Sequence, residues 1–291
     1  MRFPDAIVLL YHRVAEPAAD PWGLRVAPGN FAEQLEVLHR RALVVPLSDI
    51  RRIRDRARPV VSITFDDGYL DNLTVAKPLL EKFALPATAF VMTAGLAHDH
   101  TPWWDDLEAI MLGTEPIEWP AQKDVLTRYL ETWQRLRDVD EARREAALES
   151  LLAESGRRRH EGGNDRLMRA DEVASLAAGG LIEVGAHTCS HPSLASLPLV
   201  AQESEIAGSR AHLEDVLGRP VTSFAYPFGR REHYTPATVA LVREAGFLFG
   251  CAHEPRPIEP ESSNVELPRV PVKDHDGDSF ERWLFEQLSY Q

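Results

Sequence analysis

Short apolar runs alternate along most of this chain with longer stretches that have helical periodicity. The runs are rich in Val, Ile, Leu, Phe and Ala and nearly continuous, which is typical of parallel strands covered on both faces. They predict strands at Ala6–Tyr11, Leu43–Pro46, Val60–Phe65, Ala87–Met92, Ile182–Ala186, Thr222–Ala225 and Phe247–Cys251. Strands that alternate with helices indicate βαβ units and therefore a parallel sheet, with closure into a barrel as one option.

The stretches between these strands carry helix signals. Asn30 is a candidate N-cap for a helix that carries Phe31, Leu35 and Leu38 on one face. Further helices are predicted at 70–83, at 199–217 before Gly218 and Pro220, and from Thr235 and Pro236 to about Gly246.

The alternation stops between about Asp99 and Arg169, where no run has the character of a strand. Three helices are predicted there instead, at Asp105–Leu112, Ala121–Leu136 and Glu141–Glu154, followed by a charged loop at 156–164. We interpret this region as a helical insertion after the fourth strand. Its Trp103 and Trp104 either bind a sugar face or pack in the core of the insertion, and we favour packing. Arg157–Arg159 is either a solvated segment or an attractor of an anionic substrate.

Composition narrows the function classes. The 291 residues include 45 acidic and 32 basic side chains, a formal net charge of −13. A surface this acidic repels phosphate backbones and anionic lipid, so no nucleic-acid partner and no polybasic membrane anchor is expected. The two cysteines, Cys189 and Cys251, exclude a disulfide-rich scaffold and fit a reducing compartment, although one bridge is compatible with them.

No run approaches the roughly 18 apolar residues of a membrane span. The first apolar run has no extended basic region before it and no small-residue cleavage site, and it leads into the polar Tyr11-His12-Arg13. We therefore interpret it as a buried strand rather than a signal peptide, and a cytoplasmic location is the default expectation.

Two adjacent carboxylates follow the third predicted strand, in Thr64-Phe65-Asp66-Asp67-Gly68. The carboxyl ends of the strands line the active face of a βα barrel, and Gly68 lets the chain turn so that both acids reach one pocket. Two acids this close are costly unless a cation or a proton lies between them. The alternative is a helix N-cap followed by an acidic residue of the first helical turn.

Two histidines four residues apart, His187 and His191, follow the fifth predicted strand. Such a pair either binds one metal, here from a loop because of Pro192, or is simply two surface histidines. Together with Asp67 it makes a set of two histidines and one carboxylate, which suits a hydrolytic Zn²⁺ and also Fe, Co or Ni. We favour Cys189 as a small buried thiol that points away from this set, over a thiolate ligand.

A third motif, Ala225-Tyr226-Pro227-Phe228-Gly229, leaves the sixth predicted strand. A rigid turn beside a metal can direct a backbone N–H at a developing oxyanion, although alone the motif is only an aromatic turn.

In order and type, the three motifs resemble the first three motifs of the polysaccharide deacetylase (NodB-homology) family, also called carbohydrate esterase family 4. The resemblance spans about Ile7 to Val272 and leaves 99–169 unaccounted for. It implies an α/β fold, a distorted (β/α) barrel of about seven parallel strands, here with a helical insertion after the fourth strand. It also implies a divalent metal held by one Asp and two His, and hydrolysis of acetyl groups, usually N-acetyl groups of amino sugars.

Position by position, the resemblance gives Asp66 the role of general base. It makes Asp67, His187 and His191 the metal ligands and lets the backbone N–H of Phe228 hold the oxyanion. Because the candidate residues run from His12 to Phe228, we predict a single catalytic domain over residues 1–291 with the insertion at about 99–169.

The chain departs from the family pattern in three places. Many members have an arginine that orients the base where this chain has Ala225, and Arg269 is the candidate replacement. The tryptophan-bearing fourth motif has no good match. The late Leu-x-Leu-x-His motif, the source of the general acid, is absent, and His275 only comes closest to it in position.

The start of the chain suggests a substitute acid. A subgroup of the family, which includes enzymes acting on poly-N-acetylglucosamine, begins with a Tyr-His segment similar to Tyr11-His12 and has a Phe-Ala-Tyr-Pro third motif. In that subgroup the early histidine takes the role of the acid, so we expect His12 to protonate the leaving amine. The alternative is a hydrogen-bonded residue of the barrel rim.

The predicted activity is therefore metal-dependent removal of an N-acetyl group from an amino sugar or related glycan, with release of acetate. Zn²⁺ is the first expectation for the metal, and Co²⁺, Ni²⁺ or Fe²⁺ are tolerated by the same ligands. A deformylase, an O-acetyl esterase or a non-sugar amide hydrolase would use the same residues, whereas a non-catalytic sugar-binding module would be expected to lose one of them. The missing export signal favours a nucleotide sugar, a lipid-linked intermediate or a small glycoside over a long polymer.

Overall fold

The computed structural model describes residues 6–16, 19–52, 57–113, 123–157 and 165–289. Its centre is a parallel sheet whose main path runs β10-β1-β5-β6-β7-β8-β9, and β4 pairs with β5 beside that path. The strands are β1 (Ile7–Tyr11), β4 (Leu43–Val44), β5 (Val60–Phe65), β6 (Ala87–Val91), β7 (Ile182–Ala186), β8 (Ser223–Ala225), β9 (Phe249–Cys251) and β10 (Val270–Pro271). The predicted α/β class and distorted barrel are confirmed.

The curl of the sheet comes from the segment between β9 and β10. Cys251 at the end of β9 forms a parallel bridge with Leu267, and Val270 of β10 pairs with Leu9 of β1. The chain at 267–271 therefore contacts both edges of the sheet. All residues of β1 and β5 are buried, as expected for strands covered on both faces.

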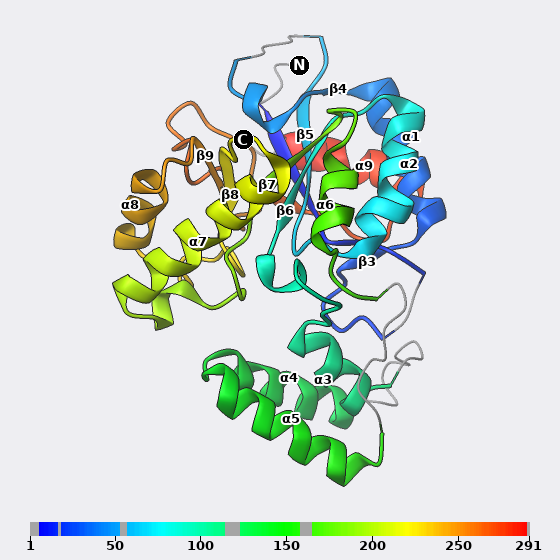
Figure 1. Ribbon diagram of the computed structural model, residues 1–291. Helices are drawn as coiled ribbons and strands as arrows, with labels where there is room; N and C mark the ends of the chain where they lie inside the picture. Colours follow the sequence, from blue (N-terminus) through cyan, green and yellow to red (C-terminus); the bar gives the residue numbers. More distant parts are fainter. Residues whose placement is uncertain (1–5, 17–18, 53–56, 114–122, 158–164, 290–291) are drawn as a thin grey trace.

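Helices surround the sheet (Figure 1). They are α1 (Pro28–Arg41), α2 (Lys77–Phe83), α6 (Ala170–Ala177), α7 (Leu199–Leu217), α8 (Pro236–Glu244) and α9 (Gly277–Ser289). Short 3-10 turns lie at Leu47–Asp49, Thr93–Gly95 and Leu194–Ser196, and the two-residue strands β2 (Arg13–Val14) and β3 (Arg25–Val26) pair beside the sheet. None of the described helices is both long enough and apolar enough to cross a membrane.

One local expectation is wrong. Asn30 does not cap α1, which begins at Pro28 after Ala27, because proline at the first helical position needs no N–H partner. The Asn30 amide instead donates to Asp274 at 2.7 Å. The helix predicted at 70–83 is confirmed, and it contains a π-helical turn at Asn72–Ala76 ahead of α2.

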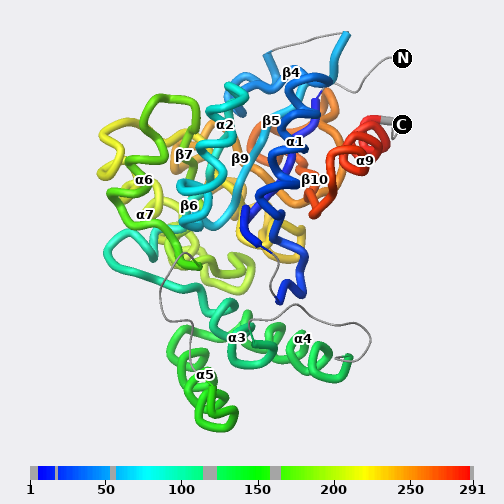
Figure 2. Tube along the Cα trace, turned by 90° about the vertical axis from the view of Figure 1, so that its right-hand side faces the viewer, coloured from blue at the N-terminus to red at the C-terminus, as the bar shows by residue number. Residues whose placement is uncertain are grey.

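The insertion consists of α3 (Trp103–Met111), α4 (Lys123–Arg137) and α5 (Glu141–Ser155), between β6 and α6. These helices enclose their own apolar cluster, built around Leu107, Ile110, Tyr129, Leu136 and Leu148. Figures 1 and 2 show them together at one end of the barrel. The charged loop predicted at 156–164 lies outside the described residues from 158 on, and Arg157 donates to the carbonyl of Ile110 at 3.1 Å.

Candidate metal centre and active site

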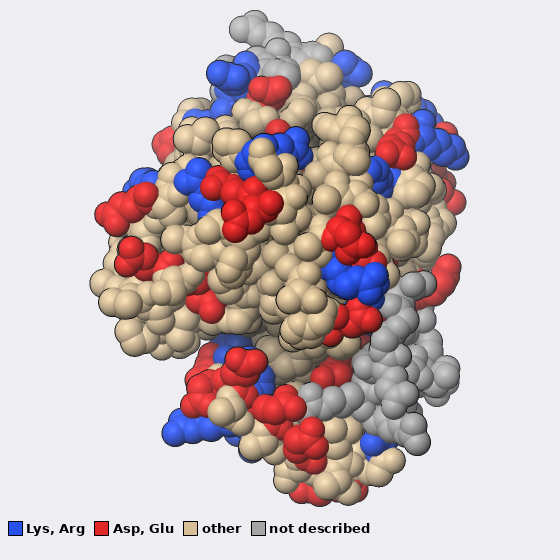
Figure 3. Space-filling model, viewed as in Figure 1, with Lys and Arg blue, Asp and Glu red and all other residues tan. Residues whose placement is uncertain are grey.

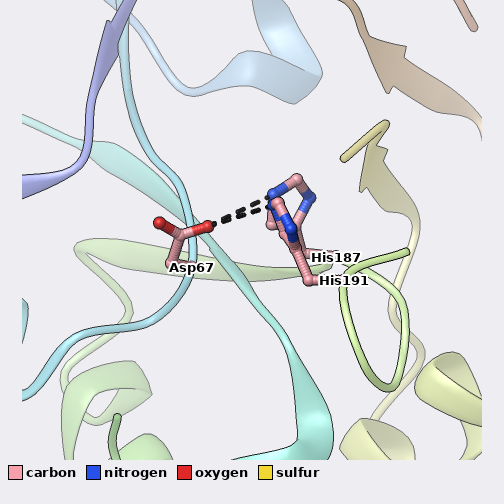
Figure 4. A group of neighbouring side chains, drawn as sticks. All are labelled: Asp67, His187 and His191. Carbon is pink, nitrogen blue, oxygen red and sulfur yellow. Dashed lines mark ion pairs between the residues drawn. The ribbon is translucent and has the colours of Figure 1, made fainter. Parts of the chain in front are cut away.

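The three predicted metal ligands meet at the carboxyl end of the sheet (Figure 4). Asp67 follows β5, His187 follows β7, and His191 lies four residues further along the loop. The Nε2 atoms of both histidines are 3.5 Å from Oδ1 of Asp67, and one ligand atom from each residue lies within 4.8 Å of the others. All three side chains are buried. The structure therefore brings together a compact set of two imidazoles and one carboxylate.

The protonation of this set fits a divalent cation. Nδ1 of His187 is 2.7 Å from the carbonyl of Ala225. A carbonyl only accepts, so the ring proton is on Nδ1 and the Nε2 lone pair faces the site. Burial lowers the pKa of His191 to about 3, so that ring is neutral at pH 7. Burial by itself would raise the pKa of Asp67, but the neighbouring His187 and His191 hold it below the usual range. Asp66 and Asp67 raise the pKa of His187 against the effect of burial, so a divalent cation would take the place of the proton that these groups share. Two imidazoles and an ionised carboxylate are the donor types that Zn²⁺ uses in catalytic sites.

The loops that carry these residues are held in left-handed backbone conformations. Asp67, Thr188, His191 and Phe228 have φ angles of 74°, 65°, 58° and 60°, and all four lie in the site loops. Such angles cost about 1–3 kcal/mol each for residues other than glycine and persist where the surroundings enforce them. Oγ1 of Thr188, for example, accepts the N–H of His191 at 3.0 Å. The geometry of the site is therefore fixed by its loops.

Asp66 is bound by Arg269 through both carboxylate oxygens. Nη1 lies 2.6 Å from Oδ1 and Nη2 lies 2.7 Å from Oδ2, and both side chains are buried. Burial would raise the pKa of Asp66, but the guanidinium outweighs it and lowers the pKa below the ordinary value. Arg269 immediately precedes β10, which brings it across the sheet to Asp66. The geometry is that of an arginine holding a carboxylate beside the metal ligands, as expected for a replacement of the missing motif arginine.

His12 and Phe228 face the same cavity as Asp66 and Asp67. His12 follows β1, is half-buried, and its carbonyl accepts a hydrogen bond from Asn72 at 2.9 Å. Burial lowers the pKa of His12, although the two aspartates oppose this. The ring of Phe228 lies 4.7 Å from that of His191, and its backbone N–H donates no hydrogen bond within the described part of the chain.

Other residues singled out in the sequence lie in different surroundings. The sulfur of Cys189 contacts the carbonyl of Glu205 on α7 at 3.6 Å, and Cys189 does not belong to the metal-binding set. His275 contacts the ring of Trp283 on α9 and does not line the cavity. Trp103 packs in the insertion, as favoured. Trp104 lines the cavity, and its ring lies 4.8 Å from that of His191 at an angle of 54°.

A buried hydrogen-bond network behind the metal ligands was not predicted. The indole N–H of Trp104 donates to the hydroxyl of Tyr69 at 2.8 Å, and that hydroxyl donates to Asp105 at 2.8 Å. The guanidinium of Arg13 lies over the Tyr69 ring, 4.3 Å from its centroid. Burial raises the pKa of Asp105 to about 7. The network ties Tyr69, two residues after a metal ligand, to the first helix of the insertion.

The segments that lead into and out of the insertion, around His100 and 166–168, form its stem, and this stem is attached to the loop that follows Asp67. The N–H of Met168 donates to the carbonyl of Gly68 at 2.9 Å, and the N–H of Leu70 donates to the carbonyl of Arg166 at 2.9 Å. The outgoing and returning chains are joined by a 3.0 Å hydrogen bond from Leu167 to His100. The insertion is therefore anchored on the residues that follow Asp67.

The cavity above the candidate metal ligands has a volume of about 590 Å³. One wall comes from barrel loops with Phe228, and the other from α4 of the insertion with Trp133 and Arg137. The rings of Trp133 and Phe228 are 5.7 Å apart, and Trp22 packs on Trp133 at 4.6 Å. The sequence contained no signal for this wall, because it depends on how α4 docks onto the barrel.

Comparison with known proteins agrees with this architecture. Residues 53–250 match the family model described as polysaccharide deacetylase. A Bacillus subtilis protein, YxkH, whose name refers to the polysaccharide deacetylases, is 23% identical over 270 residues, which are 91% of this chain and 70% of that protein.

Two solved structures share the fold. The Streptococcus pyogenes deacetylase PplD, in complex with acetate, superposes with a TM-score of 0.64 at 18% identity and covers 98% of both chains. IcaB from Ammonifex degensii superposes with a TM-score of 0.62 at 20% identity, over 96% of this chain and 97% of that one.

Proposed function

The chain belongs to the polysaccharide deacetylase family, and from that premise we propose that it is a metal-dependent hydrolase that removes the N-acetyl group of an amino sugar and releases acetate. The observation that carries this proposal is the buried set of Asp67, His187 and His191 with the Asp66–Arg269 pair beside it. Asp67, His187 and His191 would hold the cation, with Zn²⁺ preferred by the donor types. When bound, such a cation lowers the pKa of water toward about 7 and polarises the acetyl carbonyl.

Each remaining step is assigned to a residue of the chain. Asp66, held as a carboxylate by Arg269, accepts the proton of the attacking water. The free N–H of Phe228 donates to the oxygen that becomes negative as the carbonyl is attacked. His12 protonates the departing nitrogen, which is a poor leaving group without that proton. Burial opposes the protonated ring that this step needs, whereas the charges of Asp67 and Asp66 favour it. The amide C–N bond breaks, and acetate and a free amine result.

The decisive experiment is an acetate-release assay on chelator-treated protein with Zn²⁺, Co²⁺, Ni²⁺ or Fe²⁺ restored in turn. N-acetyl, N-formyl and O-acetyl sugars are compared, so that a deformylase or an esterase is recognised by its preferred substrate. We expect acetate from N-acetyl sugars only with metal restored, and a loss of at least about a hundredfold in Asp66→Asn. Near-normal turnover by Asp66→Asn would overturn the assignment of the base.

Metal binding has its own test that needs no substrate. A ligand that binds only the folded state stabilises it by about 2.7 kcal/mol at 100 times its dissociation constant. We expect Zn²⁺ to raise the melting temperature of the metal-stripped protein and to have little effect on Asp67→Asn. Equal shifts in the two proteins would place the cation elsewhere.

A further inference from the structure

The cavity above the metal ligands is more cationic than the molecule that contains it. Its lining includes four basic side chains, Arg137, Arg230, Arg269 and Lys273, against three acidic ones, Asp66, Asp67 and Glu232. In the whole chain, acidic residues outnumber basic ones 45 to 32. On the face that Figure 3 shows, acidic side chains are prominent on the insertion. Basic residues are therefore concentrated in the lining of this cavity, although the protein as a whole is acidic.

The acidic residues of the cavity lining already have partners within the protein. Asp66 is neutralised by Arg269 at 2.6 Å. Asp67 faces the two histidines as a candidate metal ligand. Glu232 lies 3.3 Å from Nε2 of His233. Three cations, on Arg137, Arg230 and Lys273, remain around the cavity without an acidic residue of the lining as partner.

Each of these cations has a donor available to a ligand. The Arg230 side chain is exposed and forms no ion pair or hydrogen bond among the described residues. Asp138 binds Nε and Nη2 of Arg137 at 2.8 and 2.9 Å, and Nη1 is left over. The Lys273 ammonium donates to the carbonyls of Trp22 and Gly23 at 2.9 and 3.0 Å, which fixes its position and leaves a third N–H.

The position of Arg137 indicates how far a bound anion would lie from the candidate metal ligands. Its guanidinium is 5.9 Å from the centroid of the Phe228 ring, and that ring is 4.7 Å from the ring of His191. One aromatic ring thus separates the guanidinium from a metal ligand. An anionic substituent on the same sugar as the acetamide group is close enough to be bound there while the acetamide faces the metal ligands.

We propose that the substrate carries an anionic group, a phosphate or a carboxylate, on or next to the acetylated sugar, and that Arg137, Arg230 and Lys273 bind it. This inference rests on the proposed deacetylase function and specifies its substrate class. Guanidinium and ammonium groups suit both anions, because charge-assisted hydrogen bonds to oxyanions are the strong ones. Neutral amino sugars are accepted less well, since they leave these cations without a partner.

Binding is measured by calorimetry on metal-stripped protein, with N-acetylglucosamine, its 1-phosphate and N-acetylglucosaminuronic acid as probes. We expect at least one of the two anionic sugars to bind about tenfold more tightly than the neutral one, and the tighter of them identifies the anion. Its affinity falls as NaCl is raised from 50 to 500 mM, because salt screens exposed charges. Equal affinity for all three sugars overturns the proposal without any variant.

Variants then locate the anion. Arg230→Gln is expected to weaken binding of the anionic sugar about fivefold, and Arg230→Glu by more. The matched control is Arg135→Gln, on the insertion helix that carries Arg137 but outside the cavity lining, which is expected to bind as the parent protein does. An effect of Arg230→Gln no larger than that of the control overturns the assignment.

Activity separates this inference from the proposed function. With metal restored, the ratio of kcat/KM for the anionic sugar to that for the neutral sugar is expected to exceed ten and to fall in Arg230→Gln. Acetate release at equal efficiency from both sugars refutes the anionic substrate and leaves the deacetylase intact. No acetate from any N-acetyl sugar, with sugar binding retained, refutes the proposed function instead.

Discussion

The pair between Asp66 and Arg269 provides the sharpest test of how the site is built. Arg269→Met keeps the length and much of the volume of the side chain and removes both hydrogen bonds to Asp66, at 2.6 and 2.7 Å. Only 1% of the Arg269 side chain and 6% of the Asp66 side chain are exposed, so water can reach the lost partner's place only from the cavity. An unpaired buried charge costs about 3–5 kcal/mol of folding free energy.

The double variant should recover much of that loss. Asp66→Asn alone leaves the guanidinium of Arg269 unpaired in the same buried place, so its cost is of the same order. When both charges are removed, no uncompensated buried charge remains, and the double variant is expected to be no less stable than either single variant. The coupling energy is then about 3 kcal/mol or more, far above the value for independent sites.

The assay is urea unfolding at pH 7 with chelator present, so that a bound cation does not contribute. A control cycle uses the exposed pair Arg256–Glu259, at 3.0 Å with exposed fractions of 38% and 54%. Arg256→Met and Glu259→Gln are expected to couple by less than about 1 kcal/mol. If the coupling energy of the buried pair is as small as that of the exposed pair, the reasoning about desolvation at this site is refuted.

Three further predictions concern positions around the site. Gly68 has a φ of +85°, and an added Cβ would lie 2.9 Å from Cγ1 of Val91. Gly68→Ala should therefore lower the free energy of unfolding by about 2–4 kcal/mol. The control Gly180→Ala, where φ is +73° and the space is open, should lower it by about 1 kcal/mol. Urea unfolding compares the two, and equal losses would rule out the steric contribution. Tyr69→Phe leaves a buried indole N–H and a buried carboxyl without their shared partner and should cost about 2–4 kcal/mol, whereas a loss under 0.5 kcal/mol would show that the network contributes little. Burial raises the pKa of Glu108 to about 8, above its unfolded value near 4.3. Its stabilising contribution is therefore complete below pH 4 and is lost as the pH rises toward 8. From pH 4.5 to 8.5 the free energy of unfolding should decline less steeply in Glu108→Gln than in the parent protein, and parallel curves would contradict the shift.

The strands and the grouping of the candidate metal ligands were predictable because their signals are local. Apolar runs such as 60–65 are long enough to identify a buried strand, and the acids or histidines that follow them lie at the carboxyl ends of parallel strands. Asp67, His187 and His191 could therefore be grouped from their places after predicted strands, and the structure brings their ligand atoms within 4.8 Å.

The parts that were not predicted depend on contacts between distant segments. β10 has two residues, Val270 and Pro271, which is too short for a periodic pattern. The wall formed by Trp133 requires α4 to dock on the barrel, and nothing in the local sequence specifies that docking. The apolar spacing that predicts a helix is the same whether its tryptophan faces a core or a cavity. Arg269 was proposed only because the resemblance left the base without its arginine, and its two hydrogen bonds to Asp66 required the three-dimensional structure.

The paired stem of the insertion has a consequence for how proteins of this kind diverge. Because a hydrogen bond from Leu167 to His100 joins the points where the chain leaves and returns, the segment between them can be lengthened, shortened or exchanged as one continuous cassette. The strands that carry Asp67 and His187 need no change when this happens. A library confined to the cassette would therefore search for new substrates while the reaction stays the same, provided that Trp104, which contacts His191, and Asp105, which accepts from Tyr69, are kept.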